Sequence, residues 1–438
     1  MSLRAGACVR DITPTKSLFL VGYPNVERDS TGVHDPLLAS ALCLRNGTDA
    51  VMLVAVDVLQ MDPQLARTLR RRIAATIGIA QANVFISCTH THSGPVTQRT
   101  RTEKPEEAYL ETFADRTLEA ALTASEEARS AELAWTTADA TGVGGNRHEK
   151  DGVCDPQVGV LVVRDAASKQ PVAVSMTYSM HPTVLHEDST LVSSDFPHYA
   201  RLQLREALGD DLVVLHHTGP AGNQSPRYHV SEQTFAEAER LGRMLGTRVA
   251  ESINALDGAA FTGETTLGGQ LVEVMLPPRE VPTVTEAQRL LAECFAEYKR
   301  LETEGAPHGP LRTAECAVFG AEHTVEFARM KEAGEWDRLI AAYSSMEVQA
   351  VRVGNACLVG LPGELFVEYG LDIKEHASCR TFVISLVNGD LHGYIATPEA
   401  AEAGCYEAST GIFDASSGRI LVDASVDLLS ELCHDPCD

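Results

Sequence analysis

One order of segments occurs three times along the chain: a pair of apolar strands, a helix, and a buried strand that runs into a polar loop. Residues 40–57 form the first pair, joined at Arg45-Asn46-Gly47, which is typical of a hairpin turn. Asp62 can cap the helix that follows, whose apolar residues recur at helical spacing over 65–77. The apolar run at 84–87 then predicts a buried strand.

Two further copies of this order predict an α/β fold in which mixed β-sheets are flanked by helices. The predicted hairpins lie at 158–178 and 348–361, the helices at 195–209 and 365–375, and the strands at 212–215 and 381–387. Functional sites in such folds usually lie where core strands end. If the copies share one sheet system, the polar residues at these ends can converge, namely Asp57, His90, His181, Ser225, Glu364 and Tyr394.

The remaining segments predict additions to one domain rather than a second domain. Residues 231–257 and 284–303 are rich in Ala, Leu and Glu and predict two helices, whereas 263–276 predicts a pair of strands. No Gly/Ser-rich or low-complexity linker divides the sequence. We therefore expect residues 1–438 to form a single domain that ends in a C-terminal tail over about 424–438.

The charge of the chain argues against polyanionic partners. Asp and Glu number 61 against 36 Lys and Arg, which gives a net charge of −25. Such a surface repels nucleic acids and anionic membranes, so the expected partner is a small-molecule substrate. The chain contains no apolar run of the roughly 18–20 residues that a membrane span needs, and we find no apolar stretch of a signal peptide. These features predict a cytoplasmic protein.

The eleven cysteines predict reduced thiols rather than a disulfide framework. Their number is odd, and most stand singly inside apolar runs, as Cys43, Cys88 and Cys357 do. Cys433 and Cys437 flank a His-Asp-Pro sequence near the C-terminus, a spacing that is weak as a metal site. We expect this last pair to lie in a loose tail.

His90-Thr91-His92 carries the sharpest local signal for chemistry. In an extended segment, residues two apart face the same side, so both imidazoles could bind one metal, or one could bind while the other transfers protons. The alternative is a pair of hydrogen-bonded structural histidines at a turn.

His181, taken alone, is more typical of a structural residue. Glu364 follows the apolar run 356–361, where a cation would compensate its burial, although a helix N-terminus would also favour a glutamate.

Two other polar segments leave structural and functional interpretations open. Tyr394 and Tyr406 lie in polar segments, where tyrosines usually contribute to packing. The glycine-rich segment 219–226 lacks the Gly-Lys-Ser/Thr ending of a P-loop. Its Ser225 lies outside a Gly-x-Ser-x-Gly motif, so the residues give little support to a serine hydrolase.

Taken together, these segments resemble the neutral/alkaline non-lysosomal ceramidase family. The resemblance keeps the same order along the chain from residue 5 to about residue 410, and such a colinear series would be hard to obtain by chance. The residues that carry it are Ala5-Gly6, Asp11-Ile12-Thr13-Pro14, His34-Asp35-Pro36-Leu37, Thr89 to Pro95, Asn146-Arg147, Asp155-Pro156, Val158, His181-Pro182-Thr183, Ser194-Asp195-Phe196-Pro197, Gly222 to Pro226, Pro362-Gly363-Glu364, Tyr394 and Tyr406.

The resemblance implies a zinc-dependent amidohydrolase with the fold of the ceramidase catalytic domain. The implied zinc ligands are His90, His181, Glu364 and Tyr394. The groups implied to bind substrate or to stabilise the tetrahedral intermediate are His92, Arg147 and Tyr406. Ser225 matches a serine once proposed as the family's nucleophile. Because a zinc-bound hydroxide removes the need for a serine nucleophile, we expect Ser225 to have a supporting role.

The sequence therefore predicts a bacterial-type zinc hydrolase that cleaves an amide bond of a small or polar N-acyl substrate. Zinc lowers the pKa of bound water from 15.7 to about 7, so metal-bound hydroxide would attack the amide. His92 would pass a proton to the leaving amine, while Arg147 and Tyr406 would donate hydrogen bonds to the oxyanion.

Lipid specificity is not expected from the sequence. We find neither the signal segment nor the C-terminal immunoglobulin-like domain of the family's ceramidases. The chain also has Asn223-Gln224 before Ser225, where true ceramidases have Gly-Asp-Val-Ser-Pro.

Two alternatives stay open at this point. The same zinc site could act as an esterase, lactonase or glycosidase, because a metal hydroxide and an oxyanion clamp do not choose the leaving group. The chain could also be a non-catalytic relative that binds a small ligand or assembles as a homo-oligomer, in which case no stoichiometric zinc is expected. Metal content and a screen of amides and esters separate these cases.

Overall fold

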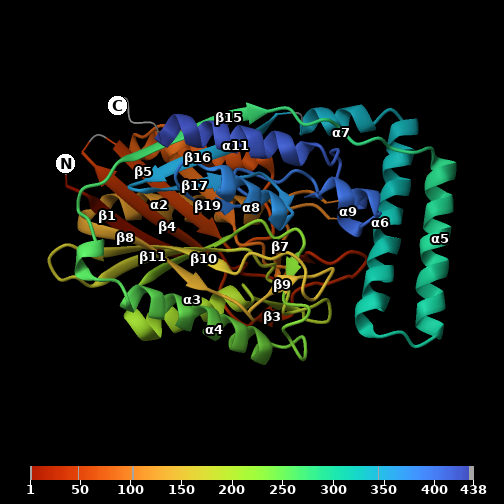
Figure 1. Cartoon of the computed structure of the whole chain (residues 1–438), viewed down its shortest axis with the longest axis horizontal. Coiled ribbons are helices and arrows are strands. Elements are labelled where there is room, and N and C mark those ends of the chain that lie inside the picture. The colour runs from red at the N-terminus through yellow and green to blue at the C-terminus, as the bar shows by residue number, and fades with distance from the viewer. Residues whose placement is uncertain (1, 48, 101–102, 344, 434–438) are drawn as a thin grey trace.

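Two β-sheets packed face to face form the core of the protein (Figure 1). The computed structural model describes residues 2–47, 49–100, 103–343 and 345–433. Within these ranges the larger sheet has eight strands, in the spatial order β13 (Val213–Thr218), β11 (Pro171–Tyr178), β10 (Gln157–Asp165), β8 (Arg129–Asp139), β1 (Arg4–Asp11), β4 (Leu38–Asn46), β5 (Asp49–Val56) and β6 (Val84–Cys88). The smaller sheet has four, in the order β15 (Leu267–Val274), β16 (Met346–Val353), β17 (Ala356–Gly360) and β19 (Arg380–Ile384).

The three copies of hairpin, helix and strand each build the same three-stranded unit. In every unit the hairpin strands are antiparallel, and the strand after the helix pairs parallel to the second hairpin strand. The connecting helices are α1 (Pro63–Ile77), α3 (Phe196–Leu208) and α8 (Val367–His376). A parallel neighbour requires a crossover connection, which these helices provide. Because parallel neighbours end at the same edge, the loops after the second and third strands of a unit lie together.

Apolar side chains from both sheets meet in the layer between them. Leu53 and Phe85 of the larger sheet pack with Leu358 and Phe382 of the smaller one. Side chains that alternate with these, such as Val54, belong to the cluster beneath α1. Burial on both faces explains why the strands are near-continuous apolar runs in the sequence.

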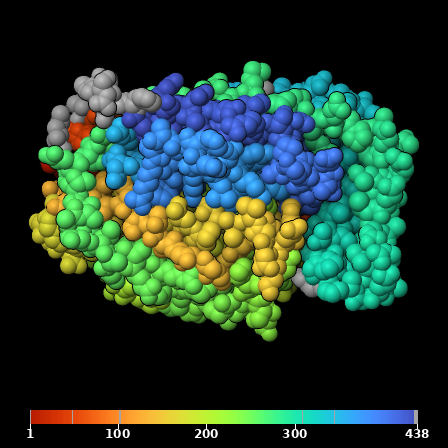
Figure 2. All heavy atoms as spheres, viewed as in Figure 1, coloured from red at the N-terminus to blue at the C-terminus, as the bar shows by residue number. Residues whose placement is uncertain are grey.

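Helices cover the outer faces of both sheets, so the prediction of mixed sheets flanked by helices is confirmed (Figure 1). The larger sheet is covered by α1, α2 (Glu107–Glu126), α3 and α4 (Phe235–Asn254), and the smaller sheet by α8 and α11 (Ser417–Cys433). A hairpin of α5 (Val284–Thr303) and α6 (His308–Glu332) forms one end of the molecule, shown in teal in Figure 2. In the part of the chain that the structure describes, no helix could span a membrane.

The structure differs from two predictions for the C-terminal third of the chain. Residues 424–433 are not a tail, because they belong to α11, whose Leu421 and Leu428 are buried among side chains of the smaller sheet. Residues 434–438, with Cys437, lie outside the described residues. The segment 263–276, predicted to form two strands that pair with each other, forms a single strand, β15. This strand pairs along its whole length with β16.

The expectation that the cysteines are all reduced is wrong for one pair. Cys379 and Cys433 form a disulfide that joins the residue before β19 to the end of α11. The two residues are 54 positions apart, and only the packing of α11 on the smaller sheet brings them together. No local motif could therefore indicate this bond. Cys43 and Cys88 are buried free thiols, as expected.

A buried ion pair connects the first unit to the second. Asp57, directly after β5, has its carboxylate oxygens 3.2 and 2.8 Å from Nη1 and Nη2 of Arg201 on α3. Arg201 is 3% exposed and Asp57 is fully buried. The Asp57 carboxylate also accepts a hydrogen bond from the backbone N–H of Leu38. Because these partners occupy the carboxylate, Asp57 has a structural role and does not join the site predicted at the strand ends.

Replacing Asp57 by Asn should lower the free energy of unfolding by about 3–5 kcal/mol, because the Arg201 guanidinium is then buried without a counter-charge. Asp115→Asn is the matched control, since Asp115 pairs with Arg72 at the surface, where an ion pair contributes about 0–1 kcal/mol. Urea unfolding followed by circular dichroism compares the two variants. Equal unfolding midpoints for Asp57→Asn and the unsubstituted protein would contradict the structural role.

Candidate metal centre and pocket

Short two-residue ladders bring the polar segments at the strand ends together. Their pairs are β2 (Leu20–Val21) with β7 (Gly94–Pro95), β9 (Gly145–Asn146) with β14 (Gln224–Ser225), and β18 (Glu364–Leu365) with β20 (Tyr394–Ile395). Each ladder joins segments that are far apart in the sequence. In the last one Glu364 lies directly opposite Tyr394. The ladders thus fix the polar loops to one another by backbone hydrogen bonds.

His90 lies in the loop after β6, in a backbone conformation that few residues other than glycine adopt. Its φ angle is 68°, in the left-handed region. Its backbone N–H donates to the carbonyl of Val58 at 3.0 Å, and its Nδ1–H donates to the carbonyl of Leu59 at 2.7 Å. A proton held on Nδ1 leaves the lone pair of Nε2 free for a metal ion.

The ring of His181, which follows β11, is oriented in the same way. Its Nδ1 lies 2.6 Å from the carbonyl of Ala221 and 3.0 Å from that of Gln224, so this nitrogen carries the proton. The loop that supplies these carbonyls is itself held in place, because the Asn223 side chain donates to the Glu368 carboxylate on α8. His181 therefore also presents a free Nε2.

Both Nε2 atoms point at one carboxylate oxygen. Oε2 of Glu364 lies 3.0 Å from Nε2 of His90 and 2.9 Å from Nε2 of His181. None of these three buried atoms has a hydrogen-bond partner in good geometry among the described residues. Two lone pairs and a carboxylate that face one another in a buried site are unfavourable unless a cation or protons lie between them. Imidazole nitrogen and carboxylate oxygen are ligands that suit zinc, so the residues fit that ion.

His92 completes a buried group of three histidines. Its ring centroid lies 5.0 Å from that of His90 and 5.7 Å from that of His181, and ligand atoms of the three rings lie within 4.8 Å of one another. Neither ring nitrogen of His92 has a hydrogen-bond partner within the described ranges. The ring packs on Gly22, where a Cβ atom would lie 2.5 Å from Nδ1, so a glycine is needed there. This group could bind a metal ion.

Burial and mutual contact shift the pKa values of these groups. Burial lowers the pKa of His181 to about 4, with the charge of Arg147 adding to the effect. Burial likewise holds the pKa of His92 well below its ordinary value. Although burial opposes it, the contact with His90 and His181 keeps the pKa of Glu364 well below its usual range. At neutral pH His92 and His181 are therefore neutral and Glu364 is ionised, which are the states that bind metals. For His90, burial is outweighed by the contact with Glu364, which raises its pKa above the ordinary value.

Tyr394 and Tyr406 lie next to the histidines. The Tyr394 ring centroid is 6.4 Å from that of His181 and 6.1 Å from that of Tyr406, while Cζ of Arg147 lies 5.4 Å from it. Burial raises the pKa of Tyr394 well above its ordinary value, and the Glu364 carboxylate raises it further. The structure thus brings the two predicted tyrosines and the predicted arginine beside the histidines.

Arg147 is held by a carboxylate that the sequence analysis missed. Its Nε and Nη2 donate to Oε1 of Glu407 at 2.9 and 2.6 Å, and Nε2 of His148 lies 2.9 Å from the same oxygen. Burial alone would raise the pKa of Glu407, but the Arg147 charge lowers it to about 2. Arg147 and Glu407 are 260 positions apart, so no local spacing could indicate the pair.

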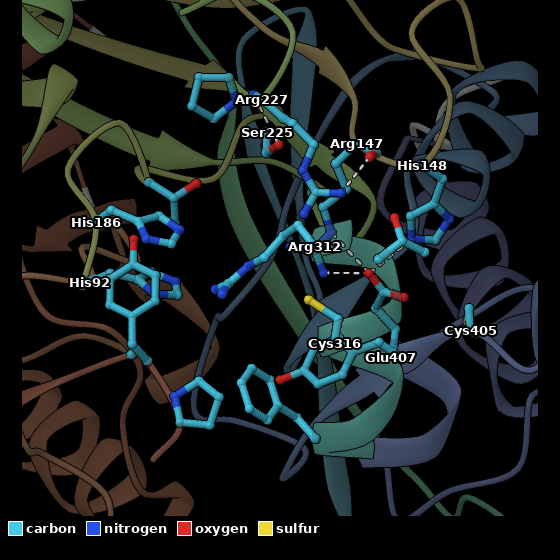
Figure 3. Close-up of a pocket in the computed structure, with 18 of the residues that line it drawn as sticks. His92, Arg147, His148, His186, Ser225, Arg227, Arg312, Cys316, Cys405 and Glu407 are labelled. Carbon is cyan, nitrogen blue, oxygen red and sulfur yellow. Dashed lines mark hydrogen bonds and ion pairs between the residues drawn. The ribbon is translucent and has the colours of Figure 1, made fainter. Parts of the chain in front are cut away.

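A pocket of about 610 Å³ lies beside this cluster (Figure 3). The predicted residues that line it are His92, Arg147, Ser225, Tyr394 and Tyr406. Other lining residues, which the sequence analysis did not single out, include Tyr23, Arg227, Arg312, Cys316 and Glu407. Figure 3 shows His92 and His186 on one side and Cys316 and Glu407 on the other, with the arginines between them. Arg312 and Cys316 come from α6, a helix that the sequence analysis did not predict.

Ser225 lines the pocket, but no general base is bound to it. Its Oγ accepts a hydrogen bond from the backbone N–H of Arg227 at 3.2 Å. Among the described residues, no imidazole or carboxylate forms a hydrogen bond with this oxygen. A serine nucleophile needs an adjacent base, so this arrangement favours a supporting role for Ser225.

Comparison with known proteins confirms the family resemblance over the first half of the chain. Residues 3–214 match the family described as neutral/alkaline non-lysosomal ceramidase, N-terminal. The matched range contains His90, His92, Arg147 and His181, whereas Ser225 and the later site residues lie beyond it. No curated protein matches the chain.

Two solved structures share the fold over almost the whole chain. The neutral ceramidase from Pseudomonas aeruginosa has 18% sequence identity and a TM-score of 0.73, with 99% of this chain and 74% of that chain covered. A structure described as ceramidase complexed with C2 has 17% identity and a TM-score of 0.74, with 99% and 75% covered. The expected ceramidase-like fold is confirmed.

Glu364→Gln and His181→Ala should each weaken zinc binding by more than about 100-fold. Loss of a residue that only hydrogen-bonds to a metal ligand weakens binding by about 10–100-fold, and these substitutions remove a ligand itself. The reason is that each substitution removes one of the atoms that converge at 2.9–3.0 Å. His376→Ala is the control, because His376 lies exposed on α8 and should bind zinc like the unsubstituted protein. Calorimetric titration with zinc measures the affinities, and undiminished binding by both site variants would refute this metal centre.

Proposed function

We propose that this chain, which matches the neutral/alkaline non-lysosomal ceramidase family over residues 3–214, is a zinc-dependent hydrolase that cleaves an amide bond of a small or polar N-acyl substrate. One observation carries the proposal: Nε2 of His90 and Nε2 of His181 converge on Oε2 of Glu364 beside a pocket. A pocket of about 610 Å³ is of the size that small-molecule sites have, roughly 300–1,000 Å³.

The proposed zinc ligands are His90, His181, Glu364 and Tyr394. When bound, zinc polarises a carbonyl oxygen and lowers the pKa of water to about 7. The protein keeps both imidazoles in the tautomer that ligation needs, because backbone carbonyls accept the Nδ1 protons. The pairing of Tyr394 opposite Glu364 supports its inclusion, because it brings the two residues side by side.

His92 is the proposed proton carrier. It lines the pocket, and its ring nitrogens have no hydrogen-bond partner within the described ranges. Burial keeps the pKa of His92 low, so the ring is neutral at pH 7, and a proton that it accepts from the attacking water would stay on it only briefly. The leaving amine is the stronger base and receives that proton.

Arg147 and Tyr406 are the proposed donors to the oxyanion that forms on the carbonyl. Both line the pocket, and the ion pair with Glu407 fixes the orientation of the Arg147 guanidinium. Donors that are already oriented stabilise the developing charge without reorganisation, and the loss of one such donor typically costs about 10²–10³ in kcat. Glu407 is therefore a positioning residue for Arg147.

Removal of the metal with a chelator should abolish hydrolysis of N-acyl amides, and added zinc should restore it. His90→Ala should lose both zinc and activity. His92→Ala should keep stoichiometric zinc yet lose about 10²-fold or more in kcat, the usual contribution of a proton-transferring group. Metal analysis with amide and ester assays tests this. If His92→Ala loses zinc like His90→Ala, His92 is a ligand, and if only esters are cleaved, the amide assignment fails.

Ser225→Ala should retain turnover within about tenfold of the unsubstituted protein, because no base activates this serine and water is the proposed nucleophile. Steady-state kinetics with the same amide measures this. Mass spectrometry of the protein during turnover provides the decisive control. An acyl group trapped on Ser225 would show that the serine is the nucleophile.

A further inference from the structure

Arg227, in the loop after β14, brings an uncompensated charge to the pocket wall. Its Nη1 donates to the backbone carbonyl of Arg147 at 2.9 Å. In the part of the chain that the structure describes, its guanidinium forms no ion pair with a carboxylate within 4.0 Å. Burial lowers the pKa of Arg227, and the charge of Arg147 lowers it further. A partly buried cation without a counter-charge is unfavourable, so a pocket that keeps one is suited to an anion.

The other arginines of the pocket are paired with carboxylates. Arg147 is bound by Glu407. Arg312 donates to Glu315 at 2.6 Å and to Glu187 at 3.2 Å. Arg227 thus differs from its neighbours in a chain that has 61 acidic residues available. Because acidic residues outnumber basic ones in this chain, a lining arginine without a carboxylate partner among the described residues distinguishes this pocket.

Three arginines line the pocket, although the chain carries a net charge of −25. The charged and titratable residues on the wall include Arg147, Arg227, Arg312, His92, His148, His186, Glu232 and Glu407. Arg227 contacts the backbone carbonyl of Arg147, and Figure 3 draws Arg312 in the same pocket. Arg147 and Arg312 are compensated by their carboxylates, so Arg227 is the arginine of the lining whose charge is left to attract an anion. Tyr23, Val230 and Phe319 supply apolar surface in the same pocket.

We propose that the substrate carries a carboxylate and that the guanidinium of Arg227 binds it in the pocket. The inference rests on the proposed function, because it names the substrate class of the same site: an N-acyl compound whose amine portion bears a carboxylate, as in an N-acyl amino acid. A guanidinium matches a carboxylate with two parallel hydrogen bonds, which a neutral amide cannot reproduce. The apolar part of the wall then accommodates the acyl chain.

The test uses ligands that cannot be hydrolysed, so that binding is measured apart from catalysis. In 4-oxoundecanoate a methylene replaces the amide nitrogen of N-octanoylglycine, and 4-oxoundecanamide is its neutral counterpart. Calorimetry on the protein as purified should give at least about tenfold tighter binding of the carboxylate, since hydrogen bonds to charged groups are the stronger ones. Arg227→Gln should reduce the difference to twofold or less, and Arg227→Lys should restore part of it.

Arg129→Gln is the matched control, because Arg129 pairs with Asp165 at the surface, at the start of β8, and its loss should leave the preference unchanged. Equal binding of the two ligands by the unsubstituted protein would overturn the inference. So would an Arg227→Gln variant that keeps the preference, or one that weakens both ligands alike, since Arg227 would then only support the Arg147 backbone. A protein that prefers the carboxylate but hydrolyses no amide would refute the proposed function and leave the anion site standing.

Discussion

Because both faces of the two central sheets are buried, the large polar site of this protein lies where the strands end. Leu53 and Phe85 occupy the layer between the sheets, and Val54 faces the helices on the other side. A charged side chain buried against a sheet needs a partner, as Glu347 of β16 has in Arg70 of α1 at 2.7 Å. The position of the site is therefore a consequence of the core: it lies in the loops after β6, β11, β13, β17 and β19, fastened by two-residue ladders.

The candidate metal centre depends on backbone groups as much as on its own side chains. The carbonyls of Leu59 and Ala221 accept the Nδ1 protons of His90 and His181, and this fixes which nitrogen of each ring faces Glu364. The left-handed conformation of His90 turns its ring inward directly after β6. Such a conformation costs of order 1–3 kcal/mol and persists only where the surroundings hold it. Here the hydrogen bonds to Val58 and Leu59 hold it.

The contrast between the acidic chain and the Arg227 charge in its pocket underlies the proposed specificity. The net charge of −25 disfavours anionic surfaces over long distances, but salt screens that field beyond about 8 Å under physiological conditions. Inside the pocket, the Arg227 guanidinium would act on the proposed carboxylate at contact distance. A small soluble anion is therefore a better match to the proposal than a large anionic surface.

Local spacing in the sequence determined the three units and the individual candidates for chemistry. Hairpin turns, helix caps and apolar periodicity are properties of neighbouring residues, so the strands and connecting helices of the units, and the His90-Thr91-His92 motif, could be read directly. Only the tertiary structure decided which charges are paired. Glu407 binds Arg147 from 260 positions away, and Cys433 reaches Cys379 across 54. Arg227 has no carboxylate partner among the described residues, although the chain is rich in carboxylates. Pairing depends on distance in space, and long-range packing, which leaves no local pattern, sets that distance.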